Sequence, residues 1–291
     1  MKKNKQIKPT LAVKLKELAI CTPSRDGMFP INFVSTAESI LKDVPEGWDI
    51  KYSLVRGTSD IVNARNAFFN KWYYESDTTA MLFLDSDVGF RGSDLKKLLE
   101  YSEIDGVDFI GGNYTKKVIE LPKVLQIASK WKTPEIDMKE LISASASYVS
   151  TGKHILYEDG KFEGLCEIDG IGMGCFLITR KTANKLMSWA SENMQKTKFT
   201  TFGDACSGYA LFNPVSSSEG NYGEDYSFCM RVKEAGLSIF CDPKMEFSHT
   251  GNWDFFGKFS HALDYFKKEK ITEVNMDANK WSDNKTEQLK K

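Results

Sequence analysis

The sequence predicts an α/β protein with a mixed, mostly parallel central sheet flanked by helices. Segments with strand-like and helix-like spacing alternate between residues 17 and 111, which is the pattern of a layered α/β domain. The run Ala80–Leu84 is short and wholly apolar, as in a strand buried on both faces of a parallel sheet. Hydrophobic residues make up 41% of the 291 positions, which is enough for a sizeable core.

The elements of the first 111 residues follow from apolar spacing and turn signals. We expect strands at 18–21, 48–55, 79–84 and 107–111, and helices at 30–41, 59–74 and 93–101. A turn-rich loop covers 22–27, directly after the first strand. Ser59 is a plausible N-cap of the second helix, with Asp60 in its first turn.

The second part of the chain is less regular. Residues 112–165 suggest strands and a hairpin near Gly160–Gly164, and a strand at 174–179 leads into a helix at 181–194. Residues 195–222 are rich in Gly, Ser, Thr and Asn, so we expect a long loop and a candidate lid. A helix opens at Gly223 and ends at Gly236, and a last strand covers 238–242.

Composition excludes several classes of protein. The 39 basic and 40 acidic residues give a net charge of −1, which disfavours a nucleic-acid partner. The six cysteines include no CxxC pair, so they are expected to be reduced, buried thiols rather than zinc ligands. The sequence contains neither GxxxxGK[ST] nor GxSxG, which removes support for a P-loop ATPase or a serine hydrolase of that type.

The chain is expected to be cytoplasmic and without a transmembrane segment. No apolar run approaches the roughly 18 residues of a membrane span, and the longest is strand-sized. The basic start at 1–9 lacks the apolar region of a signal peptide. This start is interpreted as a solvated tail, with peripheral contact to an anionic membrane as the alternative.

Two acids one residue apart, Asp85 and Asp87, follow the apolar strand at 79–84. Ligands of open α/β sheets bind beyond the carboxyl ends of the strands, and carboxylates suit Mg²⁺ or Mn²⁺. The pair is therefore a candidate metal clamp for a diphosphate, although the same pattern also arises by chance in solvated turns.

Two further positions are candidates for roles in catalysis and metal binding. Glu224 and Asp225 open a helix, where one carboxylate could act as a general base and where acids are also common without any function. His249 lies at the end of an element and could complete a metal site with Asp85 and Asp87. A lone histidine is more often structural.

Together these motifs resemble the glycosyltransferases of the GT-A fold, over roughly residues 17–257. The likeness rests on Phe83-Leu-Asp-Ser-Asp87, on Gly223-Glu-Asp-Tyr-Ser-Phe-Cys-Met-Arg231, on His249, and on Asn63-Ala-Arg-Asn66. It implies a GT-A type, Rossmann-like sheet. It also implies three regions: a basic tail at 1–16, a GT-A domain at 17–260, and a C-terminal helix and polar tail at 261–291.

The resemblance implies a role for each matching position. Asp87 would be the main ligand of Mn²⁺ or Mg²⁺, with Asp85 and His249 as further ligands. Asp225 would be the base of an inverting transfer, with Glu224 as its neighbour or substitute. The remaining implied contacts to the nucleotide sugar involve Thr22, Pro23, Ser24, Arg65, Asp85 and Ser86. The loop Gly172–Gly174 would border the sugar and acceptor, and Trp253 could stack on a sugar.

The function expected from the resemblance is transfer of a sugar from a nucleotide sugar, with UDP as the default, to a hydroxyl of a glycan, lipid-linked or protein acceptor. A retaining transferase of the same fold remains an alternative. So does a metal-dependent nucleotidyltransferase, although the loop at 22–27 has only one Arg and one Gly where such enzymes carry a basic, Gly-rich loop. A non-catalytic sugar-binding protein would not need all of the acids.

Overall fold

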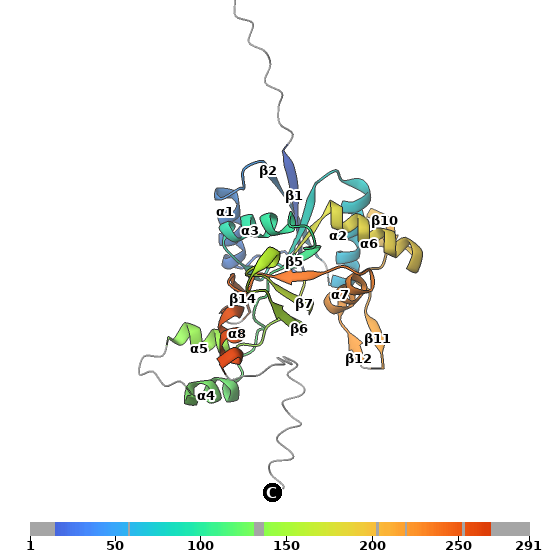
Figure 1. The fold of residues 1–291 in the computed structure, drawn as a ribbon. Coiled ribbons are helices and arrows are strands. Elements are labelled where there is room, and N and C mark those ends of the chain that lie inside the picture. The colour runs from blue at the N-terminus through green and yellow to red at the C-terminus, as the bar shows by residue number, and fades with distance from the viewer. Residues whose placement is uncertain are drawn as a thin grey trace, which may run out of the picture.

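A computed structural model describes residues 15–57, 59–130, 137–201, 204–218, 220–251 and 254–268. Its centre is an eight-stranded sheet in the order β2-β1-β3-β8-β5-β13-β7-β6 (Figure 1). The strands are β1 (Lys16–Ser24), β2 (Trp48–Arg56), β3 (Ala80–Leu84), β5 (Phe109–Gly111), β6 (Thr151–Leu156), β7 (Cys166–Gly170), β8 (Cys175–Thr179) and β13 (Ile239–Cys241). β7 and β8 run opposite to the other six, so the predicted mixed, mostly parallel α/β sheet is confirmed.

Helices cover both faces of this sheet. In Figure 1, α1 and α3 lie on one side, and α2, α6 and α7 lie on the other. Their bounds are α1 (Ile31–Lys42), α2 (Ile61–Glu75), α3 (Gly92–Ser102), α6 (Arg180–Asn193) and α7 (Glu224–Glu234). Every residue of β3 is buried, as expected of a strand covered on both faces.

Further helices and a second sheet lie in the lower part of the molecule in Figure 1. The sheet is β15 (Asp254–Lys258), β14 (Glu246–Thr250) and β4 (Val88–Gly89). Next to it lie α4 (Leu121–Lys130), α5 (Met138–Ser145) and α8 (Phe259–Lys268). A 3₁₀ turn at Gly160–Phe162 lies within the β6–β7 connection, and its Phe162 packs against Phe240 of the central sheet. The helices α4 and α5 lie in the region that was predicted to be irregular. They were not predicted because each is short and because α4 carries a proline at its second position.

The prediction of a long loop at 195–222 is wrong. The segment forms two hairpins, β9 (Lys196–Thr201) with β10 (Asp204–Tyr209), and β11 (Val215–Ser217) with β12 (Gly220–Tyr222). Phe199 and Cys206 pack with Ala67 of α2, so the first hairpin is anchored to the body of the protein. A Cβ on Gly208 would lie 1.7 Å from Oδ1 of Asn70, so close packing requires this glycine. Because the β9–β10 hairpin is packed against α2, this part of the segment does not support the lid hypothesis.

Two local predictions have different outcomes. The N-cap of α2 is Asp60 rather than Ser59, because the Asp60 carboxylate accepts the backbone N–H of Asn63 at 3.0 Å. All six cysteines are buried and free, as the reduced-thiol prediction required. Burial raises the pKa of the Cys21 thiol to about 12, so it stays protonated.

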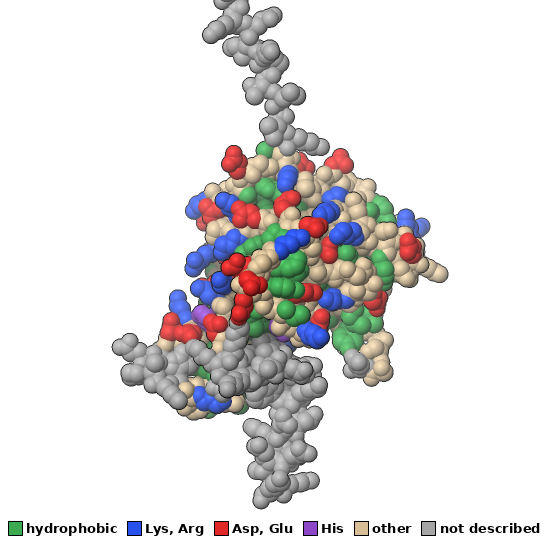
Figure 2. Space-filling model, viewed as in Figure 1, with side chains coloured by type: hydrophobic (Ala, Val, Ile, Leu, Met, Phe, Trp, Pro, Cys, Tyr) green, Lys and Arg blue, Asp and Glu red, His purple; other side chains and the backbone are tan. Residues whose placement is uncertain are grey.

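The described helices include none long and apolar enough to cross a membrane. Figure 2 shows acidic and basic side chains interspersed over the visible face, in agreement with the balanced net charge of −1. Residues 1–14 of the expected tail at 1–16, and residues 269–291 of the expected C-terminal helix and tail at 261–291, lie outside the described residues. The region boundaries at 16/17 and 260/261 stay predictions. Helix α8 spans the second of them.

Candidate active site

The predicted site residues gather where β1 and β3 end. These strands pair in parallel, with Cys21 opposite Phe83, so Thr22 and Asp85 follow at the same edge of the sheet. Helix α2 brings Arg65 to this edge, and the N-terminus of α7 brings Asp225. The carboxyl ends of strands are the usual ligand-binding edge of such a sheet.

Three carboxylates surround the guanidinium of Arg65, which is only 2% exposed. Its Nη2 donates to Asp85 Oδ2 at 3.0 Å, and its Nε lies 3.6 Å from Asp225 Oδ1 and 3.9 Å from Glu224 Oε1. Burial lowers the pKa of Arg65, but Asp85 and Asp225 outweigh it and hold the pKa above its usual value. We call these four residues the Arg65 cluster. One cation faces three carboxylates, so the excess negative charge favours a second cation or a protonated carboxyl group in the cluster.

Asp225 is the member of the Arg65 cluster that could exchange a proton near neutral pH. Burial raises its pKa to about 7; Arg65 opposes the shift, and Glu224 and Asp85 add to it. Its Oδ1 is buried without a hydrogen-bond partner. This Oδ1 still lies 3.6 Å from Nε of Arg65. A carboxylate with a pKa near neutral and an oxygen that makes no hydrogen bond has the properties of a general base.

Asp87 belongs to a second group at the edge of the sheet, next to His249. The short strand β4 pairs with β14, which places His249 opposite Val88, and the N–H of Thr250 donates to the Asp87 carbonyl at 2.7 Å. His249 Nε2 then lies 3.7 Å from Asp87 Oδ1. The Nζ of Lys117 donates to the other Asp87 oxygen, Oδ2, at 2.5 Å. Asp87, His249 and Lys117 are called the Asp87 group below.

The imidazole of His249 is arranged as a metal ligand would be. Its Nδ1 lies 2.8 Å from the carbonyl oxygen of Thr115, which can only accept, so Nδ1 carries the hydrogen. Burial lowers the pKa of His249, so the ring is neutral and Nε2 presents a lone pair towards Asp87. A histidine whose second nitrogen donates to a carbonyl is the usual arrangement at metal centres.

The predicted ligand triad of Asp85, Asp87 and His249 is only partly assembled. Within the part of the chain that the structure describes, no three His, Cys, Asp or Glu residues are grouped to hold a metal ion. Asp85 turns one oxygen to Arg65, while its Oδ1 is buried without a partner. Asp87 and His249 alone fit a metal that binds mainly through substrate phosphates, which is how Mg²⁺ is commonly held.

The residues predicted to contact the nucleotide take different positions. Thr22 lies two residues before the end of β1; it is fully buried, and its hydroxyl has no hydrogen-bond partner. Pro23 is buried beside it, and Ser86 is partly exposed. The Ser24 hydroxyl accepts the N–H of Gly27 and donates to the Met28 carbonyl. Ser24 therefore orders its own loop.

The loop Gly172–Gly174 is buried rather than open to an acceptor. The hydroxyl of Tyr114 accepts the N–H of Gly174, and the Gly174 carbonyl accepts the N–H of Asp85 at 2.9 Å. A Cβ on Gly172 or Gly174 would lie 2.6 or 2.5 Å from the Tyr114 hydroxyl. The two glycines therefore leave space for the Tyr114 ring. Tyr114 reaches Asp85 indirectly, because its hydroxyl binds the N–H of Gly174, and the Gly174 carbonyl binds the N–H of Asp85. Trp253 lies outside the described residues.

Lys117 and Tyr114 were not predicted from the sequence. Both follow β5, so their position after a sheet strand was the available signal. Gly172 and Gly174, on either side of Met173, were a second available signal, because two nearby glycines leave space for a large side chain.

Comparisons with known proteins find structural likeness without sequence support. No protein-family model matches the chain, and a search of curated proteins finds no match. Solved structures with similar coordinates include A197 from STIV, with 16% identity, a TM-score of 0.44, and coverage of 81% of this chain and 86% of that one.

Two other similar structures are glycosyltransferase complexes. A mutant of the Drosophila β-1,4-galactosyltransferase 7, with manganese, UDP-Gal and xylobiose, has 13% identity, a TM-score of 0.36, and coverage of 92% and 79%. GalNAc-T7 with UDP, GalNAc and Mn²⁺ has 9% identity and a TM-score of 0.43, and the match covers 82% of this chain and 44% of that one.

Proposed function

We propose that the protein is a metal-dependent glycosyltransferase that moves a sugar from a nucleotide sugar to a hydroxyl acceptor with inversion. The observation that carries this proposal is that Asp225, with its raised pKa and an oxygen that makes no hydrogen bond, lies at the same edge of the sheet as the Asp87–His249 pair. The sequence resemblance to GT-A transferases adds UDP as the first nucleotide to test.

In the proposed reaction, Asp225 removes the proton from the acceptor hydroxyl as its oxygen bonds to the anomeric carbon of the donor. The bond from that carbon to the phosphate oxygen breaks, and the leaving diphosphate takes the electron pair. Asp225 accepts the proton readily because its pKa lies near 7, so its two protonation states differ little in free energy at neutral pH.

The other residues of the site bind and orient. Arg65 holds Asp85 and Asp225 in fixed positions, because its planar guanidinium cannot lose its charge and is buried in α2. Asp87 and His249 would hold Mn²⁺ or Mg²⁺, which when bound supplies Lewis-acid stabilisation of the charge on the leaving diphosphate. The buried hydroxyl of Thr22, which has no hydrogen-bond partner in the protein, would face the nucleotide only after local movement of the end of β1.

The test of the base is Asp225→Asn, which keeps the shape of the side chain and removes its capacity to accept a proton. We expect donor binding within about three-fold of the parent and turnover lowered by about 100-fold or more. Asp94→Asn is the matched control, because Asp94 is also a buried acid in the first turn of a helix. Near-parental turnover of Asp225→Asn would reject Asp225 as the base.

Donor and stereochemistry need separate measurements. Nucleotide sugars are screened by thermal shift with and without Mn²⁺, since a ligand that binds the folded state raises its melting temperature. The anomeric configuration of the product is then read by NMR. Retention of configuration would replace the inverting mechanism with the retaining alternative.

A further inference from the structure

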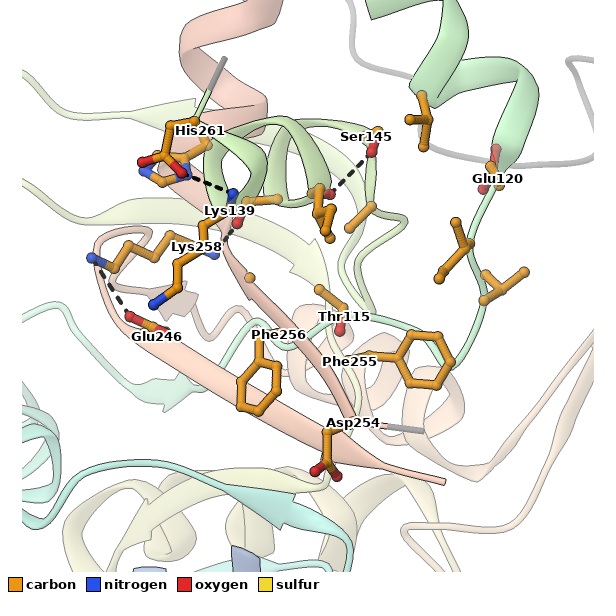
Figure 3. A pocket seen from close by; sticks show the side chains of 18 residues that line it. Thr115, Glu120, Lys139, Ser145, Glu246, Asp254, Phe255, Phe256, Lys258 and His261 are labelled. Carbon is orange, nitrogen blue, oxygen red and sulfur yellow. Dashed lines mark hydrogen bonds and ion pairs between the residues drawn. The ribbon is translucent and has the colours of Figure 1, made fainter. Parts of the chain in front are cut away.

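A cavity of about 610 Å³ lies between α5, β15 and the segment from Thr115 to Val124 (Figure 3). Its volume falls within the roughly 300–1,000 Å³ of small-molecule pockets. We propose that this cavity binds the apolar aglycone of a neutral glycoside, and that this amphiphile is the acceptor. The binding claim stands by itself, while the acceptor role rests on the function proposed above.

The cavity presents carbon surface to its contents. Its apolar lining comes from the segment before α4 and from α4, α5 and β15, and it includes Val118, Ile119, Val124, Ile142, Phe255 and Phe256. Ile119 and Phe256 are each about half exposed, at 50% and 49%, so this surface is open to solvent and not part of the core. A bare sugar placed there would turn hydroxyls onto carbon without hydrogen bonds, which is costly, whereas an alkyl or aryl group would gain from burial.

The charges around the cavity favour an uncharged head group. Four lining carboxylates face two lining lysines, and Figure 3 places Lys139, Lys258 and Glu246 together at one end and Asp254 apart from them. Glu246 already pairs with Lys258 at 3.7 Å. Arg91 also lies 3.9 Å from Glu246, and Lys123, which donates to the carbonyl of Ala146, lies near Glu120. At the other end, an anionic head group would meet the carboxylate of Asp254, whereas sugar hydroxyls can donate to it.

The cavity shares a wall with the Asp87 group. Thr115 lines the cavity, and its backbone carbonyl accepts the hydrogen bond from Nδ1 of His249. On the neighbouring strand, Phe255 pairs with His249 and Asp254 pairs with Thr250. The Asp254 end of the cavity is thus the end nearest the candidate metal ligands, and a glycoside with its aglycone inside would present its sugar there.

The proposal is tested by binding of methyl, butyl and octyl β-glucoside, each below its micelle concentration, measured by calorimetry without metal or nucleotide. We expect octyl glucoside to bind at least about ten-fold more tightly than methyl glucoside, because apolar burial grows with chain length. Octanoate and octyl phosphate serve as anionic probes of equal chain length, and we expect each to bind at least about three-fold more weakly than octyl glucoside.

Variants locate the site. Ile119→Trp fills the cavity from its rim and should abolish the dependence on chain length, while Leu41→Trp, at an exposed apolar position of α1, should preserve it. Phe256→Ser removes an exposed ring and should weaken octyl glucoside about three-fold or more. Asp254→Asn should weaken all three glucosides equally. Equal binding of methyl and octyl glucoside, anionic probes that match the glucoside, or unchanged binding by Ile119→Trp would each overturn the proposal.

The outcomes separate this proposal from the proposed function. Mn²⁺ and UDP binding is measured alone on the same preparations. If UDP binds with Mn²⁺ and chain length has no effect, the amphiphile proposal fails and the transferase proposal stands. If chain length matters and UDP does not bind, the cavity site stands and its role as acceptor site fails.

Discussion

Only one residue separates Asp85 from Asp87, yet each carboxylate pairs with a different kind of cation. Asp85 pairs with Arg65, which is 2% exposed, planar and fixed in α2. Asp87 pairs with Lys117, whose flexible side chain is 34% exposed and extends from the segment after β5. The buried arginine is a permanent part of the fold, whereas the exposed lysine can be displaced by another cation. The comparison therefore assigns Asp85 to fixing the shape of the site and Asp87 to binding an exchangeable cation.

The largest effect should follow from Arg65→Met, which leaves three carboxylates facing one another in a buried site. We expect a loss of about 3–5 kcal/mol in the free energy of unfolding, measured by urea denaturation. Arg91→Met, which removes an exposed arginine 3.9 Å from Glu246, is the control and should cost less than about 1 kcal/mol. Equal losses in the two variants would show that the Arg65 cluster has no special place in the fold.

Asp225→Asn should next change how stability depends on pH. The pKa of Asp225 is raised to about 7 from a usual value of 3.8, so between about pH 4 and 7 the folded protein holds a proton that the unfolded chain has released. Stability should therefore fall as pH rises through this window, and Asn should remove that fall. Melting temperatures at pH 4.5 and 7.5 measure it. The same slope in the variant would mean that Asp225 keeps an ordinary pKa.

The Asp87 group should respond in metal affinity and hardly in stability. Asp87→Ala and His249→Ala should each weaken Mn²⁺ binding by about 10- to 100-fold in a calorimetric titration. Both side chains are partly exposed, so the melting temperature should change little. Glu103→Ala, which removes an exposed carboxylate paired with Lys16, is the control and should bind Mn²⁺ as the parent does. A parental titration for His249→Ala would make its contact with Thr115 purely structural.

The smallest effect should come from Lys117→Ala. Removing the ammonium frees Asp87 Oδ2, so Mn²⁺ should bind about three- to five-fold more tightly, as expected for a partly exposed ion pair. Lys161→Ala, which breaks an exposed pair with Asp105, should leave the affinity unchanged. Weaker Mn²⁺ binding in Lys117→Ala would instead indicate that Lys117 positions Asp87, and the contrast between the two cations would disappear.

Sequence patterns were informative where one short-range signal decides the structure. The apolar run at 80–84 predicted the buried strand β3, and the Gly223-Glu224-Asp225 start predicted helix α7. The same signals were insufficient at 195–222, because the two hairpins depend on packing against α2 through Phe199 and Cys206, which local composition does not encode.

Site prediction had the same limit. The sequence could indicate that Asp85 and Asp87 lie at the end of a strand, but not that they turn to different partners. That division depends on Arg65 being buried beneath one of them and on β14 returning beside the other, both of which are long-range contacts. Lys117 was missed for this reason, since it lies 30 residues from Asp87 in the chain.

The order of strands in the central sheet has a consequence for synthesis on the ribosome. β8 fits between β3 and β5, and β13 fits between β5 and β7, although β13 is made last. The emerging chain therefore carries open strand edges on β5 and β7 until residues 239–241 have left the exit tunnel. A nascent chain stalled before β13 should be a client of chaperones, and one released there should aggregate.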